Sequence, residues 1–153
     1  MDMRLTRVLA CAVATGVLLS GCQSSISGTA VTSPGRGPTN PQAATELQPQ
    51  NGYVFIQSGQ TRCQIDEDEV GCEAPFANTP IKDGMHANGV NLHADGTVEW
   101  IVGNLGDIPV VTIDYRTYRA LGWRIEASED GTRFTNERTG HGMFVSIDSV
   151  DTF

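Results

Sequence analysis

The sequence predicts an all-β domain, a small antiparallel sandwich or barrel rich in hairpins, behind a disordered N-terminal tether. Strand-like runs of alternating apolar and polar residues recur through residues 52–153, with turn signals about every eight to twelve residues. The same region lacks a convincing helical period, and only residues 116–121 (RTYRAL) suit a turn of helix. The predicted strands are residues 53–57, 60–65, 69–74, 88–93, 97–102, 108–115, 122–127, 131–136 and 142–147.

The first residues carry the features of a bacterial export signal. Arg4 and Arg7 supply positive charge, and the apolar run 8–19 (VLACAVATGVLL) is shorter than the roughly 20 residues that span a bilayer. Residues 19–22 (LSGC) match a lipobox, in which an aliphatic residue and two small ones precede a cysteine. The thiolate of that cysteine attacks a diacylglycerol donor. We expect residues 1–21 to be a lipoprotein signal peptide and Cys22 to be lipidated. The alternative is an ordinary secretory signal with an incidental cysteine.

A lipidated Cys22 would anchor the mature chain to the extracytoplasmic face of the cell membrane, because two or three acyl chains hold a protein stably. Residues 22–51 are rich in Pro, Ser, Thr and Gly, so we expect them to form a flexible tether ahead of a β domain at 52–153. Removing residues 1–21 takes away two arginines and one aspartate, so the formal net charge changes from −8 to −9. This acidic balance disfavours nucleic acid as a partner.

The cysteine pattern agrees with an exported protein. Cys11 falls within the signal peptide and Cys22 at its processing site, which leaves Cys63 and Cys72 as an even pair. A disulfide between them is expected in an oxidising compartment.

The first hairpin places these two cysteines opposite each other. A two-residue loop at positions 67–68 pairs Ile65 with Val70 and Cys63 with Cys72. Both are then non-hydrogen-bonded pairs, whose Cα atoms lie ~4.5 Å apart, near the lower edge of disulfide geometry. All four side chains share one face, and we expect that face to be the buried one.

A second hairpin spans residues 90–100 (VNLHADGTVEW) and offers two registers. A two-residue loop mixes apolar and polar side chains on each face. A three-residue loop, 94–96, with Gly96 in the left-handed region, opposes Leu92 to Val98 and Val90 to Trp100. This register sorts the faces, so we adopt it and expect Trp100 to lie in the core.

The third hairpin, residues 122–136, repeats the design of the first. A loop at 129–130 opposes Ile125 to Phe134, at the same separation as Cys63 and Cys72. We infer that one hairpin design is used twice, with a disulfide in one copy and an apolar contact in the other; two β-turns alike by chance are the alternative.

Two stretches resemble a known family. FIQSGQTRCQIDEDEVGCE (55–73) and the closing segment DGTRFTNERTGHGMFVS (130–146), with its Thr-Gly-His-Gly element, are similar to mycobacterial envelope lipoproteins of the Lpq/Lpp type. The resemblance implies an actinobacterial envelope lipoprotein of undefined function, without a catalytic residue to carry over. Relatives of this kind often bear a second cysteine pair, at positions held here by Ile125 and Phe134.

Candidate chemistry is sparse. The three histidines lack metal-ligand spacing, and no EF-hand loop or Gly-x-Ser-x-Gly elbow is present, so we expect no metal and no cofactor. The acidic run 66–69 suits a solvated hairpin tip. His141, between two glycines, is either a structural turn residue or a ligand-binding or catalytic group. Tyr115, Tyr118 and Trp123 offer aromatic surface for a hydrophobic or glycan ligand, although Trp123 shares the face of Ile125, which favours the core.

Three functions follow from these features. The leading interpretation is a membrane-anchored, non-enzymatic binding or interaction module whose partner is an envelope protein or a glycolipid. The second is an envelope hydrolase or glycan-acting enzyme that uses His141 with a nearby carboxylate. The third is a structural spacer or surface antigen.

Overall fold

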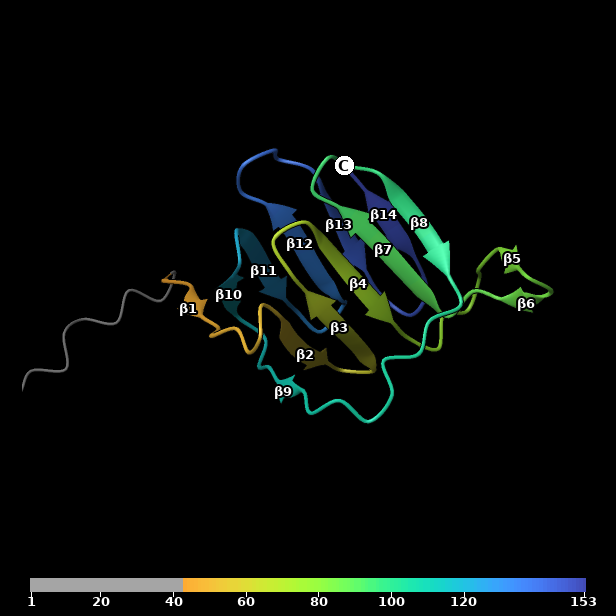
Figure 1. The fold of residues 1–153 in the computed structure, drawn as a ribbon, viewed down its shortest axis with the longest axis horizontal. Helices are drawn as coiled ribbons and strands as arrows, with labels where there is room; N and C mark the ends of the chain where they lie inside the picture. Colours follow the sequence, from red (N-terminus) through yellow and green to blue (C-terminus); the bar gives the residue numbers. More distant parts are fainter. Residues whose placement is uncertain (1–42) are drawn as a thin grey trace, which may run out of the picture. The chain divides into compact units, whose positions relative to one another are not determined.

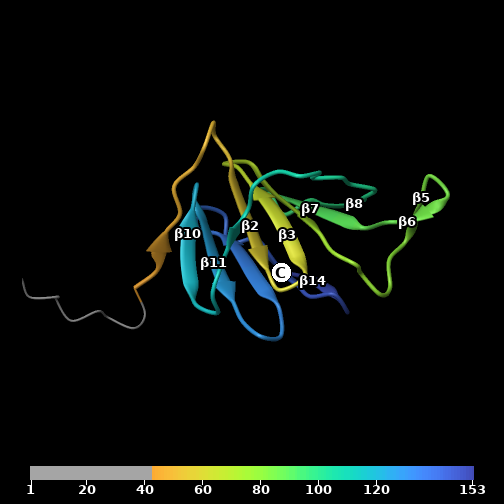
Figure 2. The same cartoon turned by 90° about the horizontal axis from the view of Figure 1, so that it is seen from below.

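The fold is a sandwich of two open β-sheets, as seen in a computed structural model that describes residues 43–153 (Figures 1 and 2). The predicted signal peptide, the lipidation site Cys22 and most of the predicted tether lie outside the described residues. Residues 43–153 form strands, turns and loops without a helix, which confirms the all-β prediction.

The strands follow one another in this order: β1 (Thr45–Glu46), β2 (Val54–Ser58), β3 (Thr61–Ile65), β4 (Glu69–Glu73), β5 (Ile81–Lys82), β6 (Met85–His86), β7 (Gly89–His93), β8 (Val98–Ile101), β9 (Val111–Thr112), β10 (Thr117–Ala120), β11 (Trp123–Ala127), β12 (Thr132–Asn136), β13 (Gly142–Val145) and β14 (Val150–Thr152). Sheet I has the strand order β8-β7-β4-β3-β2-β9, and sheet II the order β1-β10-β11-β12-β13-β14. The short strands β5 and β6 pair only with each other and project beside sheet I (Figure 1).

The two sheets share one plan. Each is an antiparallel meander with a sixth, short strand that runs parallel to the first strand of the meander. The short strands are exchanged between the sheets. β1 precedes the meander of sheet I in the chain but pairs with β10 of sheet II, and β9 precedes the meander of sheet II but pairs with β2 of sheet I. The exchange ties each half of the domain to the other.

Most of the expected strands are present, and four differences stand out. The segment 108–115 forms only the short strand β9. The expectation of a helical turn at 116–121 is wrong, because these residues form β10, where Tyr118 and Ala120 are buried on one face. β1 lies within the segment 22–51 expected to be a tether, so ordered structure begins before residue 52. The β5–β6 hairpin and β14 had no strand signal in the sequence.

The first hairpin has the predicted register, with Ile65 opposite Val70 and Cys63 opposite Cys72. The two cysteines form the predicted disulfide, with their Cα atoms 4.1 Å apart. All four side chains are buried against sheet II, whereas Gln64 is only half-buried.

The second hairpin also has the predicted register, and Gly96 adopts a φ of 91° in its turn. The expectation that Trp100 is a core residue is wrong in part. β8 is the edge strand of sheet I, so the Trp100 ring is half-buried and packs edge-to-face on Phe76, with ring centroids 5.5 Å apart.

The third hairpin pairs Ile125 with Phe134, which repeats the register of Cys63 and Cys72. The repeat extends to the preceding strands, because Thr61 pairs with the last residue of β2 and Trp123 with the last residue of β10. Thr61 and Trp123 are therefore counterparts in the two halves of the sandwich.

The core lies between the two sheets and draws on both of them. Its fully buried large side chains include Ile56 and Ile65 from sheet I and Trp123, Phe134 and Met143 from sheet II. Burying a large apolar side chain contributes about 1.5–3 kcal/mol, so this interface is the main source of stability.

Candidate functional site

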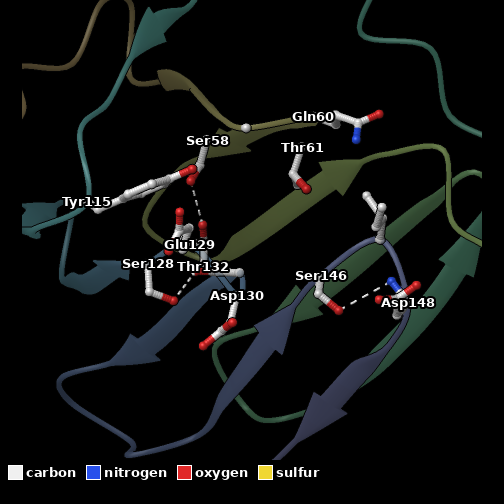
Figure 3. Close-up of a pocket in the computed structure, with 13 residues that line it drawn as sticks. Ser58, Gln60, Thr61, Tyr115, Ser128, Glu129, Asp130, Thr132, Ser146 and Asp148 are labelled. Atoms are coloured by element: carbon white, nitrogen blue, oxygen red, sulfur yellow. Dashed lines mark hydrogen bonds between the residues drawn. The ribbon is translucent and has the colours of Figure 1, made fainter.

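A cavity of about 420 Å³ opens at one end of the sandwich (Figure 3). Three turns surround it: the β2–β3 turn at residues 59–60, the β11–β12 turn at 128–131, and residues 146–148 after β13. The first of these turns belongs to sheet I and the other two to sheet II, so the cavity exists only when the sheets are stacked. Its volume lies within the roughly 300–1,000 Å³ of small-molecule sites.

The floor of the cavity consists of hydroxyl side chains that are more than nine-tenths buried. Thr132 Oγ1 donates a hydrogen bond of 2.8 Å to Ser58 Oγ, which links sheet II to sheet I. Thr61 is only 5% exposed, and its side chain points into the cavity (Figure 3). Within residues 43–153 no group is hydrogen-bonded to the Thr61 hydroxyl, and none accepts the proton of the Ser58 hydroxyl. Both residues line the cavity, so their hydroxyls are available to a ligand or to water.

The counterpart position at the other end of the sandwich holds a much larger side chain. There Trp123 is fully buried, and its indole Nε1 donates a 2.9 Å hydrogen bond to the backbone oxygen of Asp66, in the β3–β4 turn. Thr61 is much smaller than Trp123 and reaches no such partner. Thr61 therefore contributes less side-chain volume to its end of the sandwich than Trp123 does to the other end.

The rim of the cavity is acidic and carries one aromatic side chain. Three exposed carboxylates line it, those of Glu129, Asp130 and Asp148, together with Tyr115, which is 57% exposed. The lining residues, all within the described part of the chain, include no Lys, Arg or His. This combination attracts hydrogen-bond donors and disfavours anions.

A second depression, at the opposite end, differs in one respect that matters for binding. Glu67, Asp68, Asn136 and Arg138 contribute to its lining. The oxygen of the buried side chain there, Asn136 Oδ1, is engaged within its own turn, because it accepts hydrogen bonds from the backbone N–H groups of Arg138 and Thr139. We therefore take the cavity at Ser58 and Thr61 as the candidate site.

The three aromatic residues that the sequence suggested as ligand-binding groups lie in different parts of the structure. Tyr115 lies on the rim of the cavity. Trp123 and Tyr118 are both buried, and the Tyr118 hydroxyl accepts hydrogen bonds from Asp114 N and Arg116 Nε, at 2.9 and 2.8 Å. The bond from Arg116 to Tyr118 also raises the pKa of the Arg116 guanidinium. Tyr118 and Trp123 thus hold the fold together.

His141 lies at the end of the sandwich opposite the cavity, in the loop between β12 and β13. Its side chain is exposed and packs over Gly96, where an added Cβ would lie 2.7 Å from the imidazole Nδ1. Among the described residues its ring makes no hydrogen bond or ion pair, and His141 is not part of the cavity lining. The structure does not bring it together with Ser58 or Tyr115.

Asp95 lies in the turn that His141 covers. The backbone N–H of Thr97 donates a 2.9 Å hydrogen bond to Asp95 Oδ1. This bond, a second one from the Thr97 side chain, and the charges of His93 and His141 lower the pKa of Asp95 from its usual 3.8.

The acidic run 66–69 stabilises the turn of the first hairpin. Asp66 Oδ1 accepts hydrogen bonds of 2.8 Å from the backbone N–H groups of Asp68 and Glu69. No three metal-ligating side chains within residues 43–153 come close enough together to hold a metal ion.

Sequence reasoning missed the cavity, although a signal was present. Strand alternation puts Ser58 and Thr61 on the same face as Ile56 and Cys63, so two polar residues interrupt an apolar face at one end. Thr132 interrupts the facing sheet in the same way.

Within the described residues, no helix is long and apolar enough to cross a membrane. Comparison with protein-family models, with curated proteins and with solved structures found no match to this chain.

Proposed function

We propose that this protein is a lipid-anchored module on the extracytoplasmic face of the cell membrane that binds a polar ligand in the Ser58–Thr61 cavity without transforming it. The observation that carries the proposal is the cavity floor, where two hydroxyls more than nine-tenths buried have unused hydrogen-bonding capacity. A ligand that replaces water on these hydroxyls gains about 0.5–1.5 kcal/mol for each hydrogen bond that it forms.

The proposed location at the membrane is argued from the sequence. The apolar run 8–19 and the Leu-Ser-Gly-Cys motif that ends at Cys22 support export and lipidation. The Cys63–Cys72 disulfide is consistent with an oxidising compartment.

Binding is favoured over hydrolysis by the partner of Ser58. A serine nucleophile needs a neighbouring base that takes its proton. Ser58 Oγ instead accepts a hydrogen bond from the Thr132 hydroxyl, at 2.8 Å, and no histidine lines the cavity in the described part of the chain. Ser58 is therefore arranged as a recognition group.

Replacing Cys22 by Ala tests the anchor. We expect the wild-type protein to take up labelled fatty acid and to fractionate with membranes, and the Cys22→Ala protein to do neither. If Cys22→Ala stays in the membrane fraction and neither protein takes up the label, the proposed lipid anchor at Cys22 is wrong.

Filling the cavity tests the binding function. The full-length protein and its Thr61→Trp variant are purified in detergent from the same cells, and small molecules and glycolipids extracted from each are compared by mass spectrometry. We expect a set of compounds that only the wild type retains. Identical extracts from two folded proteins would overturn the binding function, and correct folding is checked by circular dichroism and by formation of the Cys63–Cys72 disulfide. Thr61→Val, which keeps the shape and removes the hydroxyl, is expected to retain less of these compounds than the wild type. Tyr53→Ala, an exposed tyrosine outside the cavity, serves as the matched control.

A further inference from the structure

We infer that the ligand of the Ser58–Thr61 cavity is a neutral saccharide, held by one pyranose ring placed beside Tyr115. This inference rests on the proposed binding function and names its ligand class. It follows from four properties of the cavity: a single hydrogen bond shared by two hydroxyls of the floor, the charge of the rim, an exposed aromatic ring, and the size of the space.

The Ser58–Thr132 hydrogen bond determines what the floor requires. The Ser58 and Thr132 hydroxyls share a single hydrogen bond, so one hydroxyl proton of the pair is left without an acceptor in either direction of that bond, and the ligand must offer an acceptor there. The Thr61 hydroxyl beside it has no partner in the described chain and can both donate and accept. A ligand that only donates, such as an ammonium group, leaves this hydroxyl proton unpaired.

The rim imposes the opposite requirement. Glu129, Asp130 and Asp148 present carboxylates, which accept hydrogen bonds and donate none when ionised. A ligand there must supply donors, and phosphates or carboxylates are repelled because no Lys, Arg or His lines this part of the described chain. An alcohol oxygen both accepts and donates, so a ligand with several hydroxyl groups meets the requirements of floor and rim together.

Tyr115 adds the feature that distinguishes a sugar ring from an open-chain polyol. Its side chain is 57% exposed at the cavity rim, next to polar groups (Figure 3). The face of an aromatic ring carries negative partial charge and attracts the slightly positive C–H groups on one face of a pyranose. The cavity, of about 420 Å³, has room for such a ring.

Three ligands with one shared ring test the inference on the full-length protein in detergent. Glucose is neutral, glucosamine is a cation and glucuronate is an anion, and cellobiose and methyl α-mannopyranoside extend the neutral set. Binding is read by saturation-transfer difference NMR, with spermidine as a cation that lacks a sugar ring. We expect saturation transfer to at least one neutral saccharide and none to glucuronate.

Matched variants locate the binding. Thr61→Trp is expected to abolish the transfer, and Thr61→Val and Tyr115→Ala to weaken the affinity roughly five- to tenfold each, as loss of one contact does. Tyr53→Ala, an exposed tyrosine outside the cavity, is expected to leave it unchanged.

The outcomes separate the saccharide from the broader proposal. Binding of spermidine or glucosamine alone, lost in Thr61→Trp, would overturn the saccharide and keep the binding function. Saccharide binding that survives in both Thr61→Trp and Tyr115→Ala would overturn the site, as would no binding of any neutral saccharide tested. Cleavage of cellobiose by the wild type and not by Thr61→Trp would overturn the non-enzymatic part of the proposed function while supporting the ligand class.

Discussion

The indole N–H of Trp123 in sheet II donates a 2.9 Å hydrogen bond to the backbone oxygen of Asp66, at the tip of a hairpin in sheet I. The Trp123 side chain is fully buried, so this bond fastens the two sheets together from inside the core. We predict that Trp123→Phe lowers the free energy of unfolding by about 1–3 kcal/mol, because the Asp66 oxygen loses its donor. Urea denaturation measures the change, and a Trp100→Phe variant, at a half-buried edge position, is the control and should lose less.

The buried hydrogen bond between Thr132 and Ser58 predicts energetic coupling between the two residues. In a double-mutant cycle with Ser58→Ala and Thr132→Val, we expect a coupling free energy of about 0.5–1.5 kcal/mol in denaturant unfolding. Additive losses would mean that the hydroxyls do not interact in solution.

The Cys63–Cys72 disulfide predicts a modest loss of stability on reduction. The two residues are separated by 9 positions, and closing so short a loop contributes roughly 2–3 kcal/mol through the entropy of the unfolded chain. We expect the free energy of unfolding, obtained from thermal unfolding with and without reductant, to differ by this amount.

The repeated hairpin register predicts an apolar substitute for the disulfide. Ile125 and Phe134 occupy the counterpart positions and are fully buried. The pair Cys63→Ile and Cys72→Phe should therefore unfold at a higher urea concentration than the pair Cys63→Ala and Cys72→Ala, because the alanines leave a void. A lower midpoint for the larger pair would show that the two hairpins differ in the space they offer.

The lowered pKa of Asp95 predicts a contribution to stability that depends on pH. A carboxyl group whose pKa is lower in the folded state stabilises that state above its unfolded pKa, about 3.8, and the contribution is lost as the pH falls through the folded value. We expect Asp95→Asn to unfold more easily than the wild type at neutral pH, with the difference disappearing on acidification. Glu67→Gln, which removes an exposed carboxylate at another turn, is the control for the loss of one surface charge.

The sequence alone determined the fold class and three hairpin registers. Strand alternation and turn chemistry are local properties, and a shift of one residue would turn every apolar side chain of a strand to the wrong face. Hence Cys63 opposite Cys72, Val90 opposite Trp100 and Ile125 opposite Phe134 could be predicted before any sheet was assembled. Local pattern failed at β10, where pairing with β11 overrides the helical character of the segment 116–121.

The candidate site was decided by tertiary structure. Ser58 and Thr61 flank the β2–β3 turn, and their positions follow from local sequence. The sequence does not say that Thr132 and Tyr115 lie beside them, because these residues approach only when the two sheets stack. Likewise, no local signal separates Tyr115, on a cavity rim, from Tyr118, buried three residues later. Strand register depends on neighbours along the chain and across one turn. A cavity depends on which side chains of the two sheets face each other and how much of the space between them they fill.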